Sequence, residues 1–127
     1  MTVFTGTKNF KPAEVACKCG CGALPSQEFM NDVQALRDLV GFPMRVTSGK
    51  RCPAHNNAVS RTGFDGPHTK DAIDFAVSHG QALKLVRCAL LAGFSGIGVQ
   101  QKGEGRFIHL DKLPNEPGQP RPTIWSY

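Results

Sequence analysis

The sequence predicts an α+β domain with a small, mostly antiparallel sheet flanked by helices. Two segments repeat apolar residues at helical spacing, residues 26–41 and residues 78–93. Short segments typical of strands lie between and after them, at 43–48, 72–77, 96–100 and 106–111. Only a short turn separates the last two strands, so we expect them to form an antiparallel pair.

The first helix has a recognisable start and end. Ser26 is the expected N-cap, Glu28 lies favourably in the first turn, and Gly41 ends the helix. Its apolar residues at near-helical spacing are Phe29, Val33, Leu36 and Val40. The residues before it, 1–25, look irregular, and they are expected to contact the core through Phe4, Phe10 and Val15.

The second helix begins with the capping-box pattern Ser78-x-x-Gln81. Its predicted buried face consists of Ala82, Leu83, Val86, Ala89 and Leu90. Residues 50–57 are polar and contain a proline, which indicates a loop leading into a short helical turn. The last segment, 113–127, contains four prolines. We expect it to lie extended across the surface, with Trp125 as its packing anchor.

Composition fits an ordinary globular chain. The 127 residues are 40% hydrophobic and 20% charged, which is enough for one core, so residues 1–127 are expected to form a single domain and a monomer. The net charge of +5 favours an anionic partner, although a merely solvated basic surface explains it equally well. Because the basic residues are scattered, we expect attraction to a surface and no nucleic-acid partner.

The sequence predicts no membrane-spanning segment and no signal peptide. No apolar stretch reaches the length that spans a bilayer, so no membrane insertion is expected. The first residues, MTVFTG, lack the basic and then apolar pattern of a signal peptide. The sequence therefore predicts synthesis in the cytoplasm, and any action outside the cell would need another route out.

Five cysteines leave more than one interpretation open. They are Cys17, Cys19, Cys21, Cys52 and Cys88. An odd number without an export signal argues against a complete disulfide framework. The first three follow a C-x-C-x-C pattern that is able to bind a soft metal, but structural zinc sites usually contain C-x-x-C pairs. Free buried thiols or one disulfide are the favoured interpretation.

The strongest chemical signal is a histidine and an aspartate six positions apart, His68 and Asp74. Asp74 lies in an apolar run predicted to be a buried strand, where an unpaired charge costs several kcal/mol. His109 lies in a second apolar strand, on the same face as Phe107 and Asp111. Two His and one Asp suit catalytic zinc with an open fourth position. A buried His–Asp pair that serves only as a structural hydrogen bond is the alternative.

Several motifs follow one another along the chain: TSGKRCPAHN at 47–56, PHT at 67–69 with AID at 72–74, GIGV at 96–99, FIHLD at 107–111, and Trp125. In this order and spacing they resemble the peptidase M15 family. That family contains zinc D-Ala-D-Ala carboxypeptidases and phage or bacterial peptidoglycan endopeptidases, with the fold of the hedgehog signalling domain. The stretch FKPAEVACKCGCG at 10–22 resembles its small phage-type branch. The resemblance covers nearly the whole chain.

The resemblance implies His68, Asp74 and His109 as Zn2+ ligands, and Arg51 as the arginine that holds the developing oxyanion or a substrate carboxylate. The chain departs from the family pattern in two places. The interval between His68 and Asp74 is one residue shorter than usual. Many relatives also carry the general base two or three residues before the third ligand, where this chain has Phe107 and Arg106.

Two other acids remain as candidates for the general base. Asp111 shares a strand face with His109, and Glu104 lies on the glycine-flanked turn before that strand. Asp111 is slightly favoured, with orientation of a metal ligand as its alternative role. His55 is a further candidate as an acid or a substrate contact.

The resemblance implies a zinc metallopeptidase that cuts peptide bonds of bacterial peptidoglycan, as an endolysin-like endopeptidase. The alternatives are a D-Ala-D-Ala carboxypeptidase or a non-catalytic cell-wall-binding member of the same fold. A basic protein without a signal peptide fits a phage lysis enzyme that reaches the wall after release. The sequence does not identify the bond that is cut.

Overall fold

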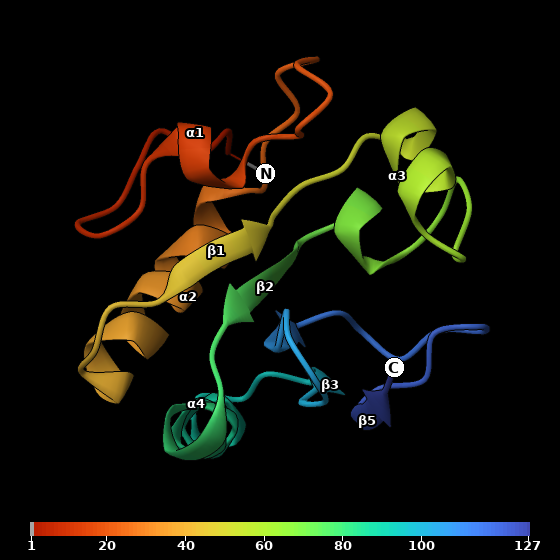
Figure 1. Ribbon diagram of the computed structural model, residues 1–127. Coiled ribbons are helices and arrows are strands. Elements are labelled where there is room, and N and C mark those ends of the chain that lie inside the picture. The colour runs from red at the N-terminus through yellow and green to blue at the C-terminus, as the bar shows by residue number, and fades with distance from the viewer. Residues whose placement is uncertain (1) are drawn as a thin grey trace.

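The computed structural model describes residues 2–127 and confirms the α+β class (Figure 1). Five strands form one sheet in the order β1-β2-β4-β3-β5. In chain order, they are β1 Arg45–Ser48, β2 Ala72–Ala76, β3 Gly96–Gln100, β4 Phe107–Asp111 and β5 Thr123–Ser126. All neighbours pair antiparallel except β3 and β5, which run parallel. The sheet is therefore mixed and largely antiparallel, and the predicted β3–β4 pair is present.

The two long helices are α2 Gln27–Val40 and α4 His79–Leu91. At the start of α2, the Ser26 hydroxyl accepts a hydrogen bond from the Phe29 N–H at 3.1 Å, as predicted. Gly41 closes this helix in the left-handed region, with φ of 78°. Across residues 2–127, no helix combines the length and apolarity needed to cross a bilayer.

The buried face of α4 was predicted correctly only in part. Ala82 and Ala89 are buried as expected, but Leu83 and Leu90 are 73% and 61% exposed, and the helix buries Leu85 and Cys88 in their place. Apolar residues lie on neighbouring stripes of this helix, so their positions alone do not determine which stripe faces the core. Within the described chain, Ser78 is the N-cap but makes no side-chain cap hydrogen bond, so the predicted capping box does not form.

Four short elements complete the fold: α1 Pro12–Val15, α3 Pro53–Val59, the 3-10 helix η1 Pro67–Thr69, and β5. The helical turn expected near residue 57 is α3, whereas α1 and η1 are too short to give a periodic pattern. The segment predicted as an extended tail becomes an edge strand, because Ile124 and Trp125 pair with β3 at Ile97 and Gly98.

Side chains along β2 and β4 point alternately to the two faces of the sheet, so one face packs on the core and the other carries the polar residues considered above. Ile73 and Phe75 of β2, with Ile108 and Leu110 of β4, belong to the cluster that also contains the buried side chains of α2 and α4. The residues between them point to the opposite face of the sheet. These residues are Asp74 on β2 and His109 on β4, which are register partners.

Candidate metal centre

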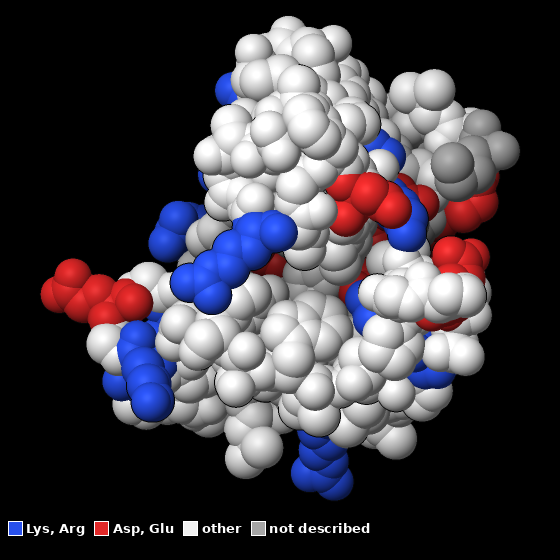
Figure 2. Space-filling model, turned by 90° about the vertical axis from the view of Figure 1, so that its right-hand side faces the viewer, with Lys and Arg blue, Asp and Glu red and all other residues white. Residues whose placement is uncertain are grey.

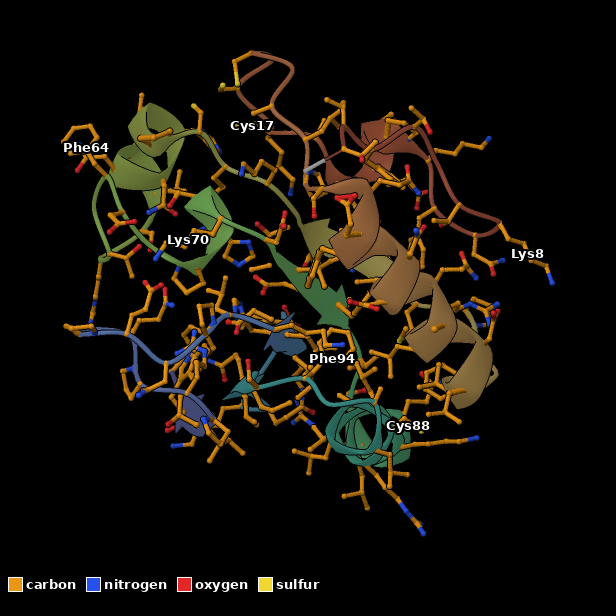
Figure 3. All side chains as sticks on the ribbon, turned by 180° about the vertical axis from the view of Figure 1, so that it is seen from behind. Lys8, Cys17, Phe64, Lys70, Cys88 and Phe94 are labelled. Carbon is orange, nitrogen blue, oxygen red and sulfur yellow. The ribbon has the colours of Figure 1, made fainter. Side chains whose placement is uncertain are left out.

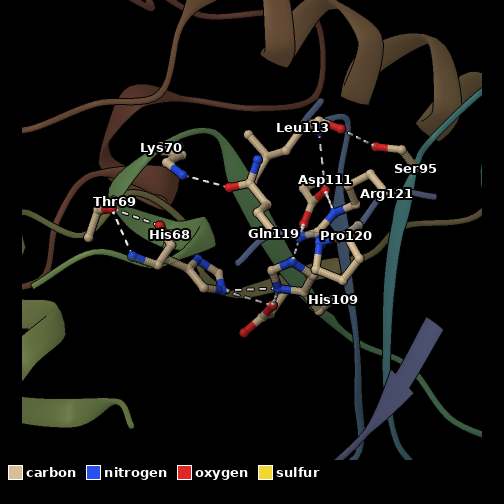
Figure 4. A network of polar contacts seen from close by, with 12 residues as sticks. His68, Thr69, Lys70, Ser95, His109, Asp111, Leu113, Gln119, Pro120 and Arg121 are labelled. Atoms are coloured by element: carbon tan, nitrogen blue, oxygen red, sulfur yellow. Dashed lines mark hydrogen bonds and ion pairs between the residues drawn. The ribbon is translucent and has the colours of Figure 1, made fainter. Parts of the chain in front are cut away.

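Asp74, His109 and His68 converge on one point of this second face. Figure 4 shows the two histidine rings directed at each other. Asp74 Oδ1 lies 3.1 Å from His68 Nε2 and 2.9 Å from His109 Nδ1, and the two imidazole nitrogens are 3.2 Å apart. All three side chains are buried. The shortened interval between His68 and Asp74 still brings both residues to the same point, because η1 turns the chain immediately before β2.

Each histidine is oriented by its other ring nitrogen. His68 Nδ1 lies 2.7 Å from the Gly49 carbonyl oxygen, and His109 Nε2 lies 2.8 Å from Asp111 Oδ2. Both partners are acceptors, so these nitrogens carry the protons. The lone pairs of His68 Nε2 and His109 Nδ1 are then directed at the same point as the Asp74 carboxylate.

Three electron-pair donors at this spacing fit a tetrahedral metal ion. At zinc–ligand distances of about 2.0–2.1 Å, tetrahedral ligand atoms lie about 3.3 Å apart. The three observed separations fall slightly below this value. A cation would also remove the repulsion between these converging lone pairs.

The cluster attracts positive charge, which either a metal ion or a proton on an imidazole supplies. Burial acts to raise the pKa of Asp74, but the contacts with His109 and His68, whose nitrogens donate to the carboxylate when they are protonated, outweigh it, and the pKa lies well below its usual range. For His109, burial acts to lower the pKa, but the hydrogen bonds to Asp111 and Asp74 raise it. The carboxylates therefore stay ionised around the imidazoles.

Asp111 is completely buried behind His109 and has no free oxygen. Arg121 Nε and Nη2 donate to its two oxygens at 2.9 and 2.8 Å, a bidentate ion pair. Burial acts to raise the pKa of Asp111, but the hydrogen bonds from His109 and Arg121 lower it to about 2. This arrangement favours the second role considered for Asp111, orienting His109, over that of general base.

Two glycines of β3 make room for this arrangement. Gly96 and Gly98 are the register partners of Asp111 and His109. A Cβ atom on Gly98 would lie 2.8 Å from Trp125 Nε1 and 2.9 Å from His109 Cβ, and one on Gly96 would overlap the Asp111 carboxylate. The GIGV motif therefore lets Trp125 pack against the His109 ring, with ring centroids 5.0 Å apart.

A pocket of about 530 Å³ opens over the three converging side chains. Arg51 lines it, and its Nη1 donates to Asn56 Oδ1 at 3.0 Å. Asn56 is only 1% exposed, and its amide donates to Thr62 Oγ1 and to the Gly63 carbonyl. Asn56 therefore holds the guanidinium of Arg51 beside the cluster. The remaining wall includes Pro67, Phe107, Trp125 and Tyr127.

The structure does not bring every candidate to this pocket. Glu104 is exposed on the turn between β3 and β4 and lines a different surface hollow, with Arg45 and Arg106. His55 lies on α3 outside the pocket lining. No role was predicted from the sequence for two positioning residues. Asn56 ends the TSGKRCPAHN motif and lies on α3, and Arg121 lies in the proline-rich tail.

Changing Asp111 to asparagine is expected to weaken zinc binding about 10–100-fold, because the amide no longer matches the proton of His109 and the fork of Arg121. Titration with a competing chelator measures this loss. Glu104→Gln, an exposed acid-to-amide change, is the matched control and should keep wild-type affinity. Unchanged zinc affinity in Asp111→Asn together with lost turnover would instead identify Asp111 as the base.

An α+β sheet that carries a His–Asp–His set with one open side, next to an arginine, has the arrangement of a mononuclear metallohydrolase. The Peptidase M15 family model matches residues 8–111, and the chain belongs to that family. M15 peptidases are metallopeptidases that typically depend on zinc. Comparison with curated proteins and with solved structures gave no match.

Proposed function

We propose that residues 1–127 act as one zinc peptidase domain that hydrolyses peptide bonds of bacterial peptidoglycan, as an endolysin-like endopeptidase. The observation that carries this proposal is the buried His68, Asp74 and His109 set on the floor of a pocket beside Arg51. Membership of the M15 family supports the peptidase class. The choice of peptidoglycan rests on the motif resemblance and on the charge of the chain.

In the proposed mechanism, the chain's residues hold the metal and the substrate carbonyl in place. Zinc bound by His68, Asp74 and His109 would supply a Lewis acid that polarises the scissile carbonyl and lowers the pKa of water. Arg51 contributes a fixed, permanently charged donor pair beside it. This guanidinium stabilises the oxyanion of the tetrahedral intermediate or binds a substrate carboxylate.

The pocket suits a short anionic peptide. Arg51 and Arg61 both line it, and the aromatic side chains of Phe107, Trp125 and Tyr127 form another part of its wall. Peptide stems of the wall carry carboxylates that such arginines bind. Away from the pocket, the Lys and Arg side chains are scattered on the face shown in Figure 2. We therefore infer that the net charge of +5 attracts the protein to the anionic cell wall in a general way. The protein would reach the wall after release from the cytoplasm.

Two features of the pocket favour the two alternative functions. Two arginines in one pocket also suit the terminal carboxylate of a D-Ala-D-Ala carboxypeptidase substrate. Among the described residues that line the pocket, Asp74 is the only carboxylate, and it belongs to the metal set. The lack of a second pocket acid is what favours a non-catalytic wall-binding role.

Digestion of purified peptidoglycan, followed by mass spectrometry of the products, tests the proposal. We expect new peptide ends with the zinc-loaded protein, loss of cleavage with a chelator, and recovery when zinc is restored. Cleavage that survives the chelator would rule out the zinc mechanism. Release of single alanines would indicate the carboxypeptidase, and sedimentation with intact wall without new fragments would indicate the binding role.

A further inference from the structure

Four of the five cysteines gather at one place outside the pocket. Cys17, Cys19 and Cys21 come from the loop that follows α1, and Cys52 comes from the residue before α3. Their Sγ atoms all lie within 4.8 Å of one another. Cys88 lies apart on α4, on the other side of the molecule from Cys17 (Figure 3).

The loop itself is folded so that three sulfurs share one side. The Cys17 N–H donates to the Ala23 carbonyl at 2.9 Å, and the Gly20 N–H donates to the Cys17 carbonyl at 3.2 Å. Gly20 and Gly22 have φ of 85° and 83°, a backbone region that favours glycine. These turns bend the C-x-C-x-C segment back on itself, which an extended strand would not do.

Cys52 reaches the loop because two backbones touch just before it. The Lys50 N–H donates to the Val15 carbonyl at 2.9 Å, and a Cβ atom on Gly49 would overlap the Val15 backbone. Both chains then continue for two residues, one to Cys17 and the other to Cys52. The meeting of the sulfurs is therefore built into the packing of the N-terminal segment on the end of β1.

The sulfur spacing fits a metal ion and not a disulfide. Cys17 Sγ and Cys19 Sγ are 3.4 Å apart, and Cys19 Sγ and Cys52 Sγ are 3.6 Å apart. A disulfide requires about 2.05 Å. Four thiolates around zinc at about 2.3 Å lie about 3.8 Å from one another in a tetrahedron. All five cysteines are unbridged in the structure.

Backbone donors already point at two of the sulfurs. The Cys52 N–H donates to Cys17 Sγ at 3.3 Å, and the His55 N–H donates to Cys52 Sγ at 3.4 Å. Hydrogen bonds of this kind stabilise a thiolate and fix its direction, as outer partners do at metal sites. A set of four sulfur ligands selects a soft or borderline ion such as zinc.

We propose that Cys17, Cys19, Cys21 and Cys52 bind a second, structural zinc ion. Four protein ligands fill a tetrahedral ion and leave no position for substrate, so this zinc has no catalytic role. Each bound thiol gives up its proton to solvent. The ion joins the N-terminal loop to the residue that follows Arg51, and so it fixes the segment that carries Arg51 into the pocket.

Metal analysis of the purified protein tests this site without any assay of activity. We expect about two zinc ions per chain, falling to about one in Cys19→Ser and, separately, in His109→Gln. Cys19 is exposed, so its serine variant removes a ligand without disturbing the core. Cys88→Ala is the control, because this buried thiol lies on α4 away from the cluster, and the variant should retain both ions.

Cobalt replacement distinguishes the two centres by their ligands. Cobalt-loaded His109→Gln should keep a strong sulfur-to-cobalt charge-transfer absorption, which Cys19→Ser should lose. A single zinc that disappears in His109→Gln, or a thiol titration showing that these cysteines have oxidised to disulfides in the purified protein, would overturn the second site. Neither outcome depends on whether the protein cleaves peptidoglycan, so this site and the proposed function succeed or fail separately.

Discussion

Replacing His109 with alanine is expected to remove zinc from the His68–Asp74–His109 centre and to lower peptidoglycan cleavage by more than about a thousandfold. His109 Nδ1 contacts the ligand atoms of both other residues, so its loss leaves two ligands and an enlarged gap. Zinc content by mass spectrometry and the rate of release of new peptide ends measure the two effects together.

Two further variants separate the loss of a ligand from a loss of folding. His109 is buried against Trp125, and its truncation also destabilises the core. His109→Gln keeps most of the volume, so it should stay folded while losing the metal. His79→Asn is the control, because His79 is exposed and its φ of 52° suits asparagine. A folded His109→Gln protein with normal zinc and normal activity would place the metal elsewhere.

Two of the three converging residues stand out in the sequence because they contradict their surroundings, and the motif resemblance also implied His68. Asp74 and His109 are polar residues inside apolar strands, and a buried charge needs a partner. Alternation also predicted that His109 and Asp111 share a face, which their hydrogen bond confirms. What the pattern did not contain was the register that places Asp74 opposite His109.

The positioning residues were beyond sequence reasoning because their partners are distant in the chain. Arg121 pairs with Asp111 through a segment predicted only as an extended tail. Asn56 acts on Arg51 through one hydrogen bond, and its place in a quoted motif does not show which residue it binds. The structure therefore favours the second role considered for Asp111, a buried carboxylate between Arg121 and the imidazole of His109.

The cysteine cluster also depends on contacts between residues that are distant in the chain. Cys17, Cys19 and Cys21 lack the usual C-x-x-C spacing of a structural zinc site, so free buried thiols or one disulfide were the favoured prediction. Cys52 completes the set only because Gly49 passes directly over the backbone of Val15. A contact between two backbones leaves no trace in a pattern of side chains.

Replacing Arg51 is the second change that we expect to reduce activity severely, and the zinc should stay bound in this variant. Arg51→Ala is expected to reduce kcat/KM about 100–1000-fold, because a fixed cation next to the developing charge is removed. Arg51→Lys should recover little of this, since an ammonium does not reproduce the fork that Asn56 holds. Steady-state kinetics on a soluble stem peptide, with zinc content measured in parallel, provide the comparison.

The way the loss divides between kcat and KM identifies what Arg51 binds. A fall in kcat indicates stabilisation of the oxyanion, whereas a rise in KM alone indicates a carboxylate held equally in the ground state and the transition state. Arg61→Ala is the matched control, because Arg61 lines the same pocket but is exposed, and its effect should be much smaller. Equal losses in the two variants, or zinc missing from Arg51→Ala, would contradict a specific role for Arg51. In that case the pocket would attract its substrate by charge alone, and orientation would have to come from its aromatic wall.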